Sequence, residues 1–425
     1  MKEDLLQYIW QFQLFDKKNL RTTEGEPLNI IRPGIINDNS GPDFHQAQVK
    51  IGELLWFGSV EIHLSSKDWK YHHHHEDNSY ENVILHVVWE GKSEITHNDG
   101  SKIPMLLLQP LVSPLLIQKY QTLLSANQNA ELACAQQLSQ VSDLVRLSVL
   151  QRSALQRVER KAKEILQSWA SNDKDWNQMA LQMTCQAFGF KVNAEAFATL
   201  GSKAKYQHIR KESYSFENLL AYMLAVSGIT VNYALPADIR KNTDYLFNKY
   251  QIQKFGMNGI EFRKSRLRPA NFPEVRMIQL SALLFQKINL LDLLVYENQL
   301  EVIWKVFQEA NLKLSSLNWK FSKFPTLGKS SIESIIINAI VPFRYAFGLH
   351  HSDEKHQEFS IQLLELISSE SNKTTKLFLK QGFKINSALE SQGVLEQYHY
   401  YCKLKKCLSC SVGCAVMKNH GLIVT

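Results

Sequence analysis

The spacing of apolar residues divides the chain into a short helical start, a strand-rich stretch and a long helical remainder. In residues 1–16 the apolar positions recur at helical spacing, which predicts an amphipathic helix. Residues 17–42 are rich in glycine and proline, and we expect a loop there. Apolar and polar residues alternate over residues 43–51 and 54–64, which predicts two antiparallel strands joined by a tight turn.

Two further segments extend the predicted sheet. Residues 83–89 are almost continuously apolar, as is typical of a central strand buried on both faces. Residues 95–97 and 103–108 flank the turn sequence Asn98-Asp99-Gly100, which predicts one more hairpin.

From residue 113 the apolar positions follow the helical period as far as about residue 369. The clearest helix covers residues 144–169, where one side is apolar and arginine and lysine occupy the rest. We interpret those charges as a solvated helix face.

Together these patterns predict an α/β (α+β) fold in three parts. Residues 1–112 form an α/β module with a mixed sheet, residues 113–400 form a large all-α region, and the cysteine-rich residues 401–425 pack on the rest. A chain of 425 residues is long enough for two or three domains.

Composition adds few constraints. The hydrophobic fraction of 44% is ordinary for a protein with a buried core, and the net charge of +7 would suit a nucleic-acid partner without requiring one. A surface with a small excess of lysine would give the same charge. The chain shows no uninterrupted apolar run long enough for a bilayer and no signal-peptide pattern, so we expect a cytoplasmic protein without a membrane partner.

The predicted hairpin carries the first candidate site. Asp43 begins the first strand, and Glu61 and His63 lie on one face of the second, so antiparallel pairing brings the three together. Two carboxylates at one point suit Mg²⁺ or Mn²⁺, and His63 could orient or deprotonate a water. The alternative is a structural aspartate at a turn and an exposed strand glutamate.

This hairpin resembles that of the PD-(D/E)xK nuclease superfamily, in which Pro-Asp opens one strand and an acid and a lysine follow on the next. Pro42-Asp43 and Glu61 match, whereas His63 stands at the lysine position. The resemblance implies metal-dependent cleavage of nucleic acid. It also implies that Glu3, on the N-terminal helix, could supply a further acid.

A histidine-rich run supplies a second candidate site. His72, His74 and Asp77 are spaced closely enough to share one ion, with His63 or His86 as a further ligand, which would suit a zinc hydrolase. The alternative is a polar loop of hydrogen-bonded imidazoles. His86, inside an apolar strand, is better explained as a core histidine.

A third candidate site is a set of cysteines near the C-terminus, namely Cys402, Cys407, Cys410 and Cys414. Their spacing predicts thiolate ligation of zinc or a [4Fe–4S] cluster. The fourth ligand could be Cys414 or the distant Cys134. The second arrangement partly resembles the iron–sulfur site of RecB-type nucleases, although there the lone cysteine precedes the catalytic motifs. The alternative is a group of reduced cysteines packed as small apolar residues.

Motifs spread over nearly the whole chain identify a family. The sequence resembles the family catalogued as domain of unknown function 2851. The resemblance rests on Ser40-Gly-Pro-Asp-Phe44, Val60-Glu-Ile-His63, Asn82-Val-Ile-Leu-His-Val-Val88, Arg268-Pro-Ala-Asn-Phe-Pro273, Asn338-Ala-Ile-Val-Pro342 and Cys407-Leu-Ser-Cys410. It implies one shared architecture and names no reaction.

Three functional hypotheses follow from the residues. The first is a metal-dependent nuclease-like phosphodiesterase that uses Asp43, Glu61 and His63. The second is a non-catalytic scaffold that binds nucleic acid or protein on a degenerate nuclease fold, and the third is a zinc hydrolase centred on His72, His74 and Asp77. The sequence does not indicate the substrate or the oligomeric state.

Overall fold

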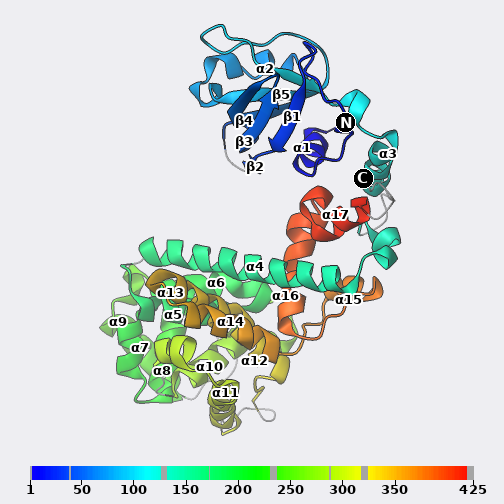
Figure 1. Cartoon of the computed structure of the whole chain (residues 1–425). Helices are drawn as coiled ribbons and strands as arrows, with labels where there is room; N and C mark the ends of the chain where they lie inside the picture. Colours follow the sequence, from blue (N-terminus) through cyan, green and yellow to red (C-terminus); the bar gives the residue numbers. More distant parts are fainter. Residues whose placement is uncertain are drawn as a thin grey trace. The chain divides into compact units, whose positions relative to one another are not determined.

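A computed structural model of the chain (Figure 1) describes residues 2–37, 40–125, 132–171, 173–229, 237–286, 289–316 and 324–418. The chain divides into two compact units. The first comprises Met1–Arg146 together with His399–Thr425, and the second is Leu147–Tyr398. The boundaries between parts that the sequence predicts lie at residues 112 and 400. The last seven residues of its cysteine-rich segment, 419–425, lie outside the described residues.

A mixed sheet organises the first unit and confirms the predicted fold class. Its strands are β1 (Leu28–Arg32), β2 (Ile35–Ile36), β3 (Phe44–Ile51), β4 (Leu54–Ser65), β5 (Val83–Glu90) and β6 (Met105–Leu107). They lie in the order β1-β3-β4-β5-β6, and β2 pairs with β3. The β3–β4 pair is antiparallel, whereas β4 pairs in parallel with β5, and β5 with β6.

The two central strands are buried along most of their length. In β4 every residue from Gly58 to His63 is buried, and in β5 the same holds from Val83 to Val88. Strands covered on both faces are normally apolar throughout. Glu61, His63 and His86 are therefore polar side chains in a place where they must find partners.

One local prediction was wrong and another was confirmed only in part. The expected loop at residues 17–42 contains β1 and β2, which a positive-φ glycine, Gly34, separates. The expected hairpin forms around its turn, where Thr96 bridges Lys102 and backbone hydrogen bonds join His97 to Ser101 and Ile103 to Ile95, but β6 runs parallel to β5. Pro104 lies just before β6 and cannot donate a ladder hydrogen bond.

Short helical elements accompany this sheet. They are α1 (Glu3–Gln11), α2 (Asp68–Tyr71), η1 (His74–Glu76), η2 (Asn78–Tyr80), η3 (Gln109–Leu111), α3 (Pro114–Ser125), η4 (Ala135–Gln140), η9 (Gln397–Cys402), η10 (Cys407–Ser409) and α17 (Ser411–Lys418). Helix α1 packs against β4, and α17 packs against α3 and η4. Trp69 of α2 is 1% exposed and joins Tyr80, Val83, Ile95 and Ile103 in a small core that fixes the loop after β4.

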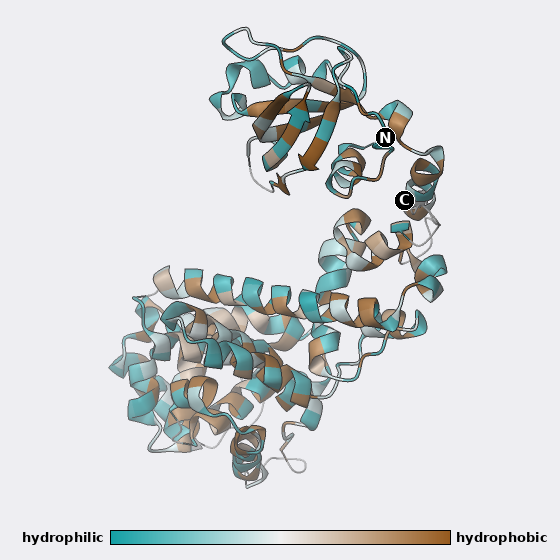
Figure 2. Ribbon diagram, in the orientation of Figure 1, coloured by the Kyte–Doolittle hydropathy of each residue, from teal (hydrophilic) through white to brown (hydrophobic). Residues whose placement is uncertain are grey.

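The second unit is helical. Its helices are α4 (Asp143–Ser171, which begins in the first unit), α5 (Trp176–Phe188), α6 (Phe190–Lys203), α7 (Tyr206–Glu212), α8 (Phe216–Ser227), α9 (Ala237–Lys249), α10 (Pro273–Leu284), α11 (Leu300–Ser315), α12 (Lys329–Ile335), α13 (Val341–His351), α14 (Glu354–Leu366), α15 (Lys373–Lys380) and α16 (Ala388–Glu396). Shorter elements are η5 (Ile252–Lys254), η6 (Pro269–Asn271) and the π-helical turns η7 (Asp292–Tyr296) and η8 (Ile336–Ile340). Helix α4 confirms the prediction for residues 144–169, and Figure 2 shows teal and brown alternating along it, as one buried side requires.

The run Lys329–His351, which joins α12, η8 and α13, is long and apolar enough by composition to cross a membrane, although the sequence analysis expected no such segment. Within the second unit 78% of its most apolar window is buried, as is typical of a core helix.

We predict that Trp69→Ala destabilises the first unit by about 3–5 kcal/mol, because it empties the centre of the small core beside β5. Hydrogen exchange of peptides from β5 should speed up accordingly. Tyr71→Ala, on the same short helix but 79% exposed, is the matched control and should change stability by less than about 0.5 kcal/mol. Equal exchange rates in the two variants would contradict this account of the loop.

Candidate metal centre

The two acids of the hairpin lie side by side, as predicted. The carboxylate of Glu61 accepts a hydrogen bond from the backbone N–H of Asp43 at 3.0 Å, and the Asp43 carboxylate accepts one from the backbone N–H of Ile62 at 3.0 Å. Gln7 of α1 donates to the second oxygen of Asp43 at 2.8 Å. These reciprocal hydrogen bonds fix both carboxyl groups at the end of the β3–β4 pair that lies away from the turn.

Both acids hold their protons tightly when no cation is near. Burial raises the pKa of Glu61 to about 9, and the neighbouring Asp43 adds to the shift. Burial also raises the pKa of Asp43 to about 7, against the hydrogen bond from Ile62, and Glu3 adds to the rise. A bound cation would favour the ionised forms of both groups.

His63 extends the site along β4. Its Nε2 lies 3.5 Å from Oε1 of Glu61, and its Nδ1 lies 2.8 Å from Nε2 of His86 on β5. The tautomer in which His63 Nδ1–H donates to His86 leaves a lone pair on Nε2, beside Glu61. A histidine that ligates a metal normally donates its other N–H in this way, so His86 is suited to orient His63.

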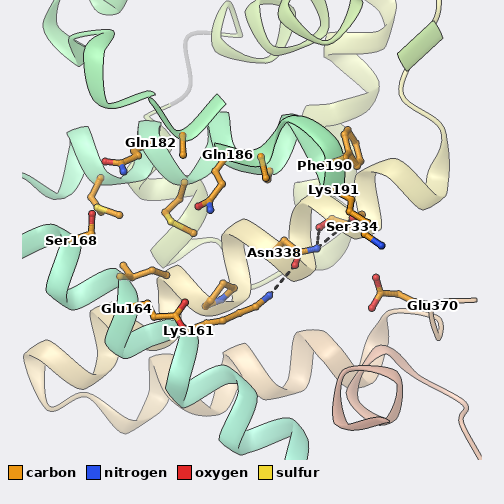
Figure 3. Close-up of a pocket in the computed structure, with 17 residues that line it drawn as sticks. Lys161, Glu164, Ser168, Gln182, Gln186, Phe190, Lys191, Ser334, Asn338 and Glu370 are labelled. Atoms are coloured by element: carbon orange, nitrogen blue, oxygen red, sulfur yellow. Dashed lines mark hydrogen bonds between the residues drawn. The ribbon is translucent and has the colours of Figure 1, made fainter. Parts of the chain in front are cut away.

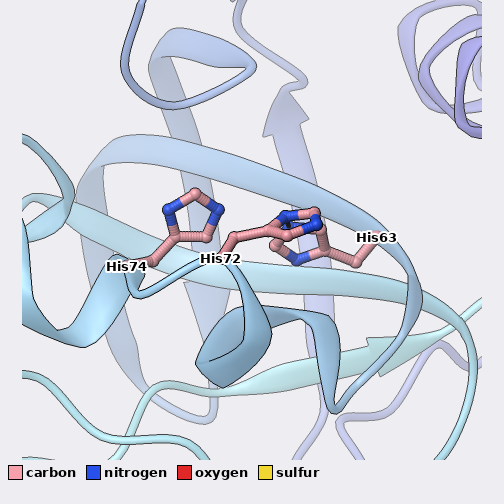
Figure 4. Close-up of side chains that lie close together, drawn as sticks. All are labelled: His63, His72 and His74. Atoms are coloured by element: carbon pink, nitrogen blue, oxygen red, sulfur yellow. Dashed lines mark hydrogen bonds between the residues drawn. The ribbon is translucent and has the colours of Figure 1, made fainter.

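The loop after β4 brings two more imidazoles to the same place (Figure 4). His72 directly follows α2, and its Nδ1 lies 3.3 Å from Nε2 of His63. His74 begins η1, and its Nε2 lies 3.4 Å from Oε1 of Glu61. The residue between them, His73, has a left-handed backbone with φ of 59°.

The geometry of these side chains fits a single ion. Ring nitrogens of His63, His72 and His74 all lie within 4.8 Å of one another. A tetrahedral ion with bonds of about 2.0–2.1 Å keeps its ligand atoms about 3.3–3.4 Å apart. The spacings of 3.3, 3.4 and 3.5 Å among the three imidazoles and Glu61 are close to this value.

The imidazoles are also in the form that binds metals. Burial, reinforced by the neighbouring histidines, lowers the pKa of His63 to about 2, that of His74 to about 4 and that of His86 to about 3. All three are therefore neutral at physiological pH. Within the described residues, Nε2 of His74 is a buried nitrogen without a hydrogen-bond partner. A cation at the centre would satisfy it.

Other predicted site residues lie at the edge of this group. Asp77 is exposed, and its Oδ1 accepts hydrogen bonds from Ser79, so it caps η2 and is not one of the clustered ligands. Glu3 is half-buried on α1, and its carboxylate acts electrostatically on Asp43, Glu61 and His72.

The cysteines form a second group within the first unit. Burial raises the pKa of Cys134 to about 12, and the nearby Cys410 and Cys407 contribute to the shift. The pKa of Cys407 is likewise raised to about 11 by burial, and Cys410 and Cys414 add to the shift. Backbone hydrogen bonds link Cys410 to Cys407 and Cys414 to Cys410. Cys402 is the last residue of η9, and Cys185 is buried in the helical core of the second unit.

The sequence places these residues in two candidate sites that share only His63. The hairpin acids and the histidine run are one constellation, because the loop after β4 folds back over Glu61 and His63. The signal that could have joined them is Trp69, a large apolar residue just before the histidines that anchors the loop.

The first unit is thus an α/β module with a buried histidine–carboxylate cluster, and a helical unit accompanies it. The chain belongs to the family described as "Protein of unknown function (DUF2851)", whose profile matches residues 3–373. No curated protein and no solved structure matches the chain.

We predict that the metal-free first unit loses stability as the pH rises from about 7 to about 9. In this range the folded state keeps the proton on Glu61 while the unfolded chain has released it, so raising the pH favours unfolding. The histidines do not contribute, because their folded and unfolded forms are both neutral above about pH 7. Urea unfolding in the presence of a chelator measures the effect, and Glu61→Gln should flatten it. An unchanged slope in that variant would contradict the assignment.

Proposed function

We propose that the protein is a metal-dependent hydrolase of phosphodiester bonds, with nucleic acid as its substrate class. One observation carries the proposal: ring nitrogens of His63, His72 and His74 lie within 4.8 Å of one another, and Oε1 of Glu61 lies 3.5 Å from Nε2 of His63 and 3.4 Å from Nε2 of His74. Imidazole ligands favour zinc, iron or similar ions over Mg²⁺, and Mn²⁺ suits the carboxylates, so we propose zinc or manganese at this centre.

Each side chain has a distinct part in this proposal. His63, His72, His74 and Glu61 hold the ion, and His86 orients His63 through their hydrogen bond. These four ligands fill a tetrahedron, so the hydrolytic water would occupy a fifth position on the ion. There the ion would lower the pKa of that water and polarise a phosphoryl oxygen. Asp43 has a pKa of about 7 when no cation is bound, and ionised beside a cation it could accept a proton from the water.

Two features support a phosphodiester substrate. The Pro42-Asp43, Glu61 and Glu3 arrangement resembles the nuclease hairpin, and α1 packs against β4 and places Glu3 within electrostatic range of both hairpin acids. The net charge of +7 favours a polyanionic partner.

We expect Glu61→Gln and His74→Ala each to lower the rate of metal-dependent cleavage by about 100-fold or more, because each removes a ligand or its charge. Cleavage of single-stranded DNA, duplex DNA and RNA should be measured with Zn²⁺, Mn²⁺ and Mg²⁺ in turn.

His73→Asn is the matched control, since His73 lies outside the cluster, is 71% exposed at its side chain, and has a left-handed backbone that asparagine tolerates. It should retain activity. If the wild type and Glu61→Gln behave alike on every substrate, the protein is a non-catalytic scaffold.

We further propose that Cys134, Cys407, Cys410 and Cys414 hold a structural zinc ion or [4Fe–4S] cluster. Burial raises the pKa of Cys134 and of Cys407, and Cys410 adds to both shifts, so these thiols are poor thiolates on their own. A metal would supply the positive charge that stabilises them. The centre would join the C-terminal helix α17 to η4, against which it packs.

Metal analysis of anaerobically purified protein should therefore show zinc or iron that Cys134→Ser removes. Cys185→Ala, a change to a buried cysteine of the second unit, should leave the metal content unchanged. Four iron atoms per centre indicate a cluster, and one zinc indicates a single ion. Retention of the full metal content in Cys134→Ser would contradict this ligand set.

A further inference from the structure

The second unit encloses a cavity of about 600 Å³, which lies apart from the residues proposed for hydrolysis (Figure 3). Helices α4, α5, α6 and α12 and the π-helical turn η8 supply most of its lining. One part of the wall is apolar, with Ile165, Met179 and Met183. Polar side chains from each of the surrounding elements complete it.

Lys161 is the unusual member of this lining. Its Nζ points toward η8 and donates a hydrogen bond to Oδ1 of Asn338 at 2.9 Å (Figure 3). Among the described residues no carboxylate lies within the roughly 4 Å of an ion pair with Lys161. The hydrogen-bond partner of its amine is a neutral amide, that of Asn338.

The carboxylates of Glu396 and Glu164 pair with arginines and not with the amine of Lys161. Arg157 and Arg160 lie nearby on α4 and share the carboxylate of Glu396, while Glu164 pairs with Arg160.

Two further charged residues line the cavity, Lys191 and Glu370 (Figure 3), and Glu370 accepts a hydrogen bond from Gln392. Burial together with Arg157 lowers the pKa of Lys161 to about 7, against the opposing effect of Glu370. A ligand that brings its own negative charge would reverse this shift.

Asn338 is presented to Lys161 by a break in the helix. Pro342 lies four residues after Asn338 and has no N–H to donate to its carbonyl, so the α-helical hydrogen bond cannot form there. The chain makes a π-helical turn at Ile336–Ile340 instead. Ser334 fixes the Asn338 side chain by accepting from Nδ2 through its backbone oxygen at 2.8 Å. Single π-turns of this kind often occur at ligand sites.

We propose that this cavity binds a small organic anion, with its carboxylate or phosphate group against Lys161 and Asn338 and its apolar body against Ile165, Met179 and Met183. Binding protonates the Lys161 amine, so the complex takes up a proton from the buffer. The proposal does not depend on hydrolysis in the first unit.

The test is calorimetry of the full-length protein at about pH 8 with three probes that share one apolar body: hexanoate, hexyl phosphate and hexanol. Hexanoate, hexyl phosphate or both should bind at least about tenfold more tightly than hexanol, because only they supply the charge. The binding enthalpy should also change with the ionisation enthalpy of the buffer. The two anions distinguish a carboxylate site from a phosphate site.

Two variants and one control make the result specific. Lys161→Met and Asn338→Asp should each weaken anion binding at least about tenfold. The second variant keeps the side-chain shape and gives Lys161 an internal carboxylate, so it remains informative if Lys161→Met fails to fold. Lys163→Met, two residues along α4 and exposed, should bind like the wild type. Equal affinity for hexanol, unchanged binding in both variants, or no binding of either anion at millimolar concentration would overturn the proposal.

Discussion

The hydrogen bond between His63 and His86 shows the constraint on which the first unit depends. Strands β4 and β5 pair in parallel and are covered on both faces, so the polar side chains that they carry cannot turn to solvent. Glu61, His63 and His86 therefore need partners among one another or in a ligand. This burial keeps the imidazoles neutral and holds them in fixed orientations, and it places the Glu61 carboxyl where its charge needs a cation. Burial of these ionisable side chains destabilises the metal-free protein, and it also holds them where a cation would bind.

The local part of this site could be predicted, and its burial could not. Antiparallel pairing after a tight turn places Asp43 beside Glu61 whatever the rest of the fold does. The alternating pattern of β4 suggested that Glu61 and His63 might face solvent, but that pattern describes one strand and not what covers it. The pairing of β5 with β4 has no local signal, and Trp69 indicates an anchored loop without indicating where the loop lies. The fold was therefore needed to show that both acids lie beside the histidine run.

The same limit applies across the second unit. The period of α4 predicted its bounds to within two residues, because a long amphipathic helix is defined by its own sequence. The hydrogen bond from Lys161 to Asn338 joins residues 177 positions apart. Pro342 marks the helix break in the sequence. It does not indicate that the break brings the Asn338 side chain to Lys161. For the cysteines, too, the sequence left open whether Cys134 or Cys414 completes the group, because the proximity of distant segments has no local signal.

The positive φ angle of His73 separates the four histidines into two alternating pairs. Because His73 adopts a left-handed conformation, His72 and His74 face His63, whereas His73 and His75 stack on each other and both contact Glu76. The four consecutive imidazoles therefore do not act as a chelating tag while the protein is folded. Retention on an immobilised-nickel resin should be weak for the native chain and strong in denaturant, so a routine purification step would report directly on the integrity of this loop.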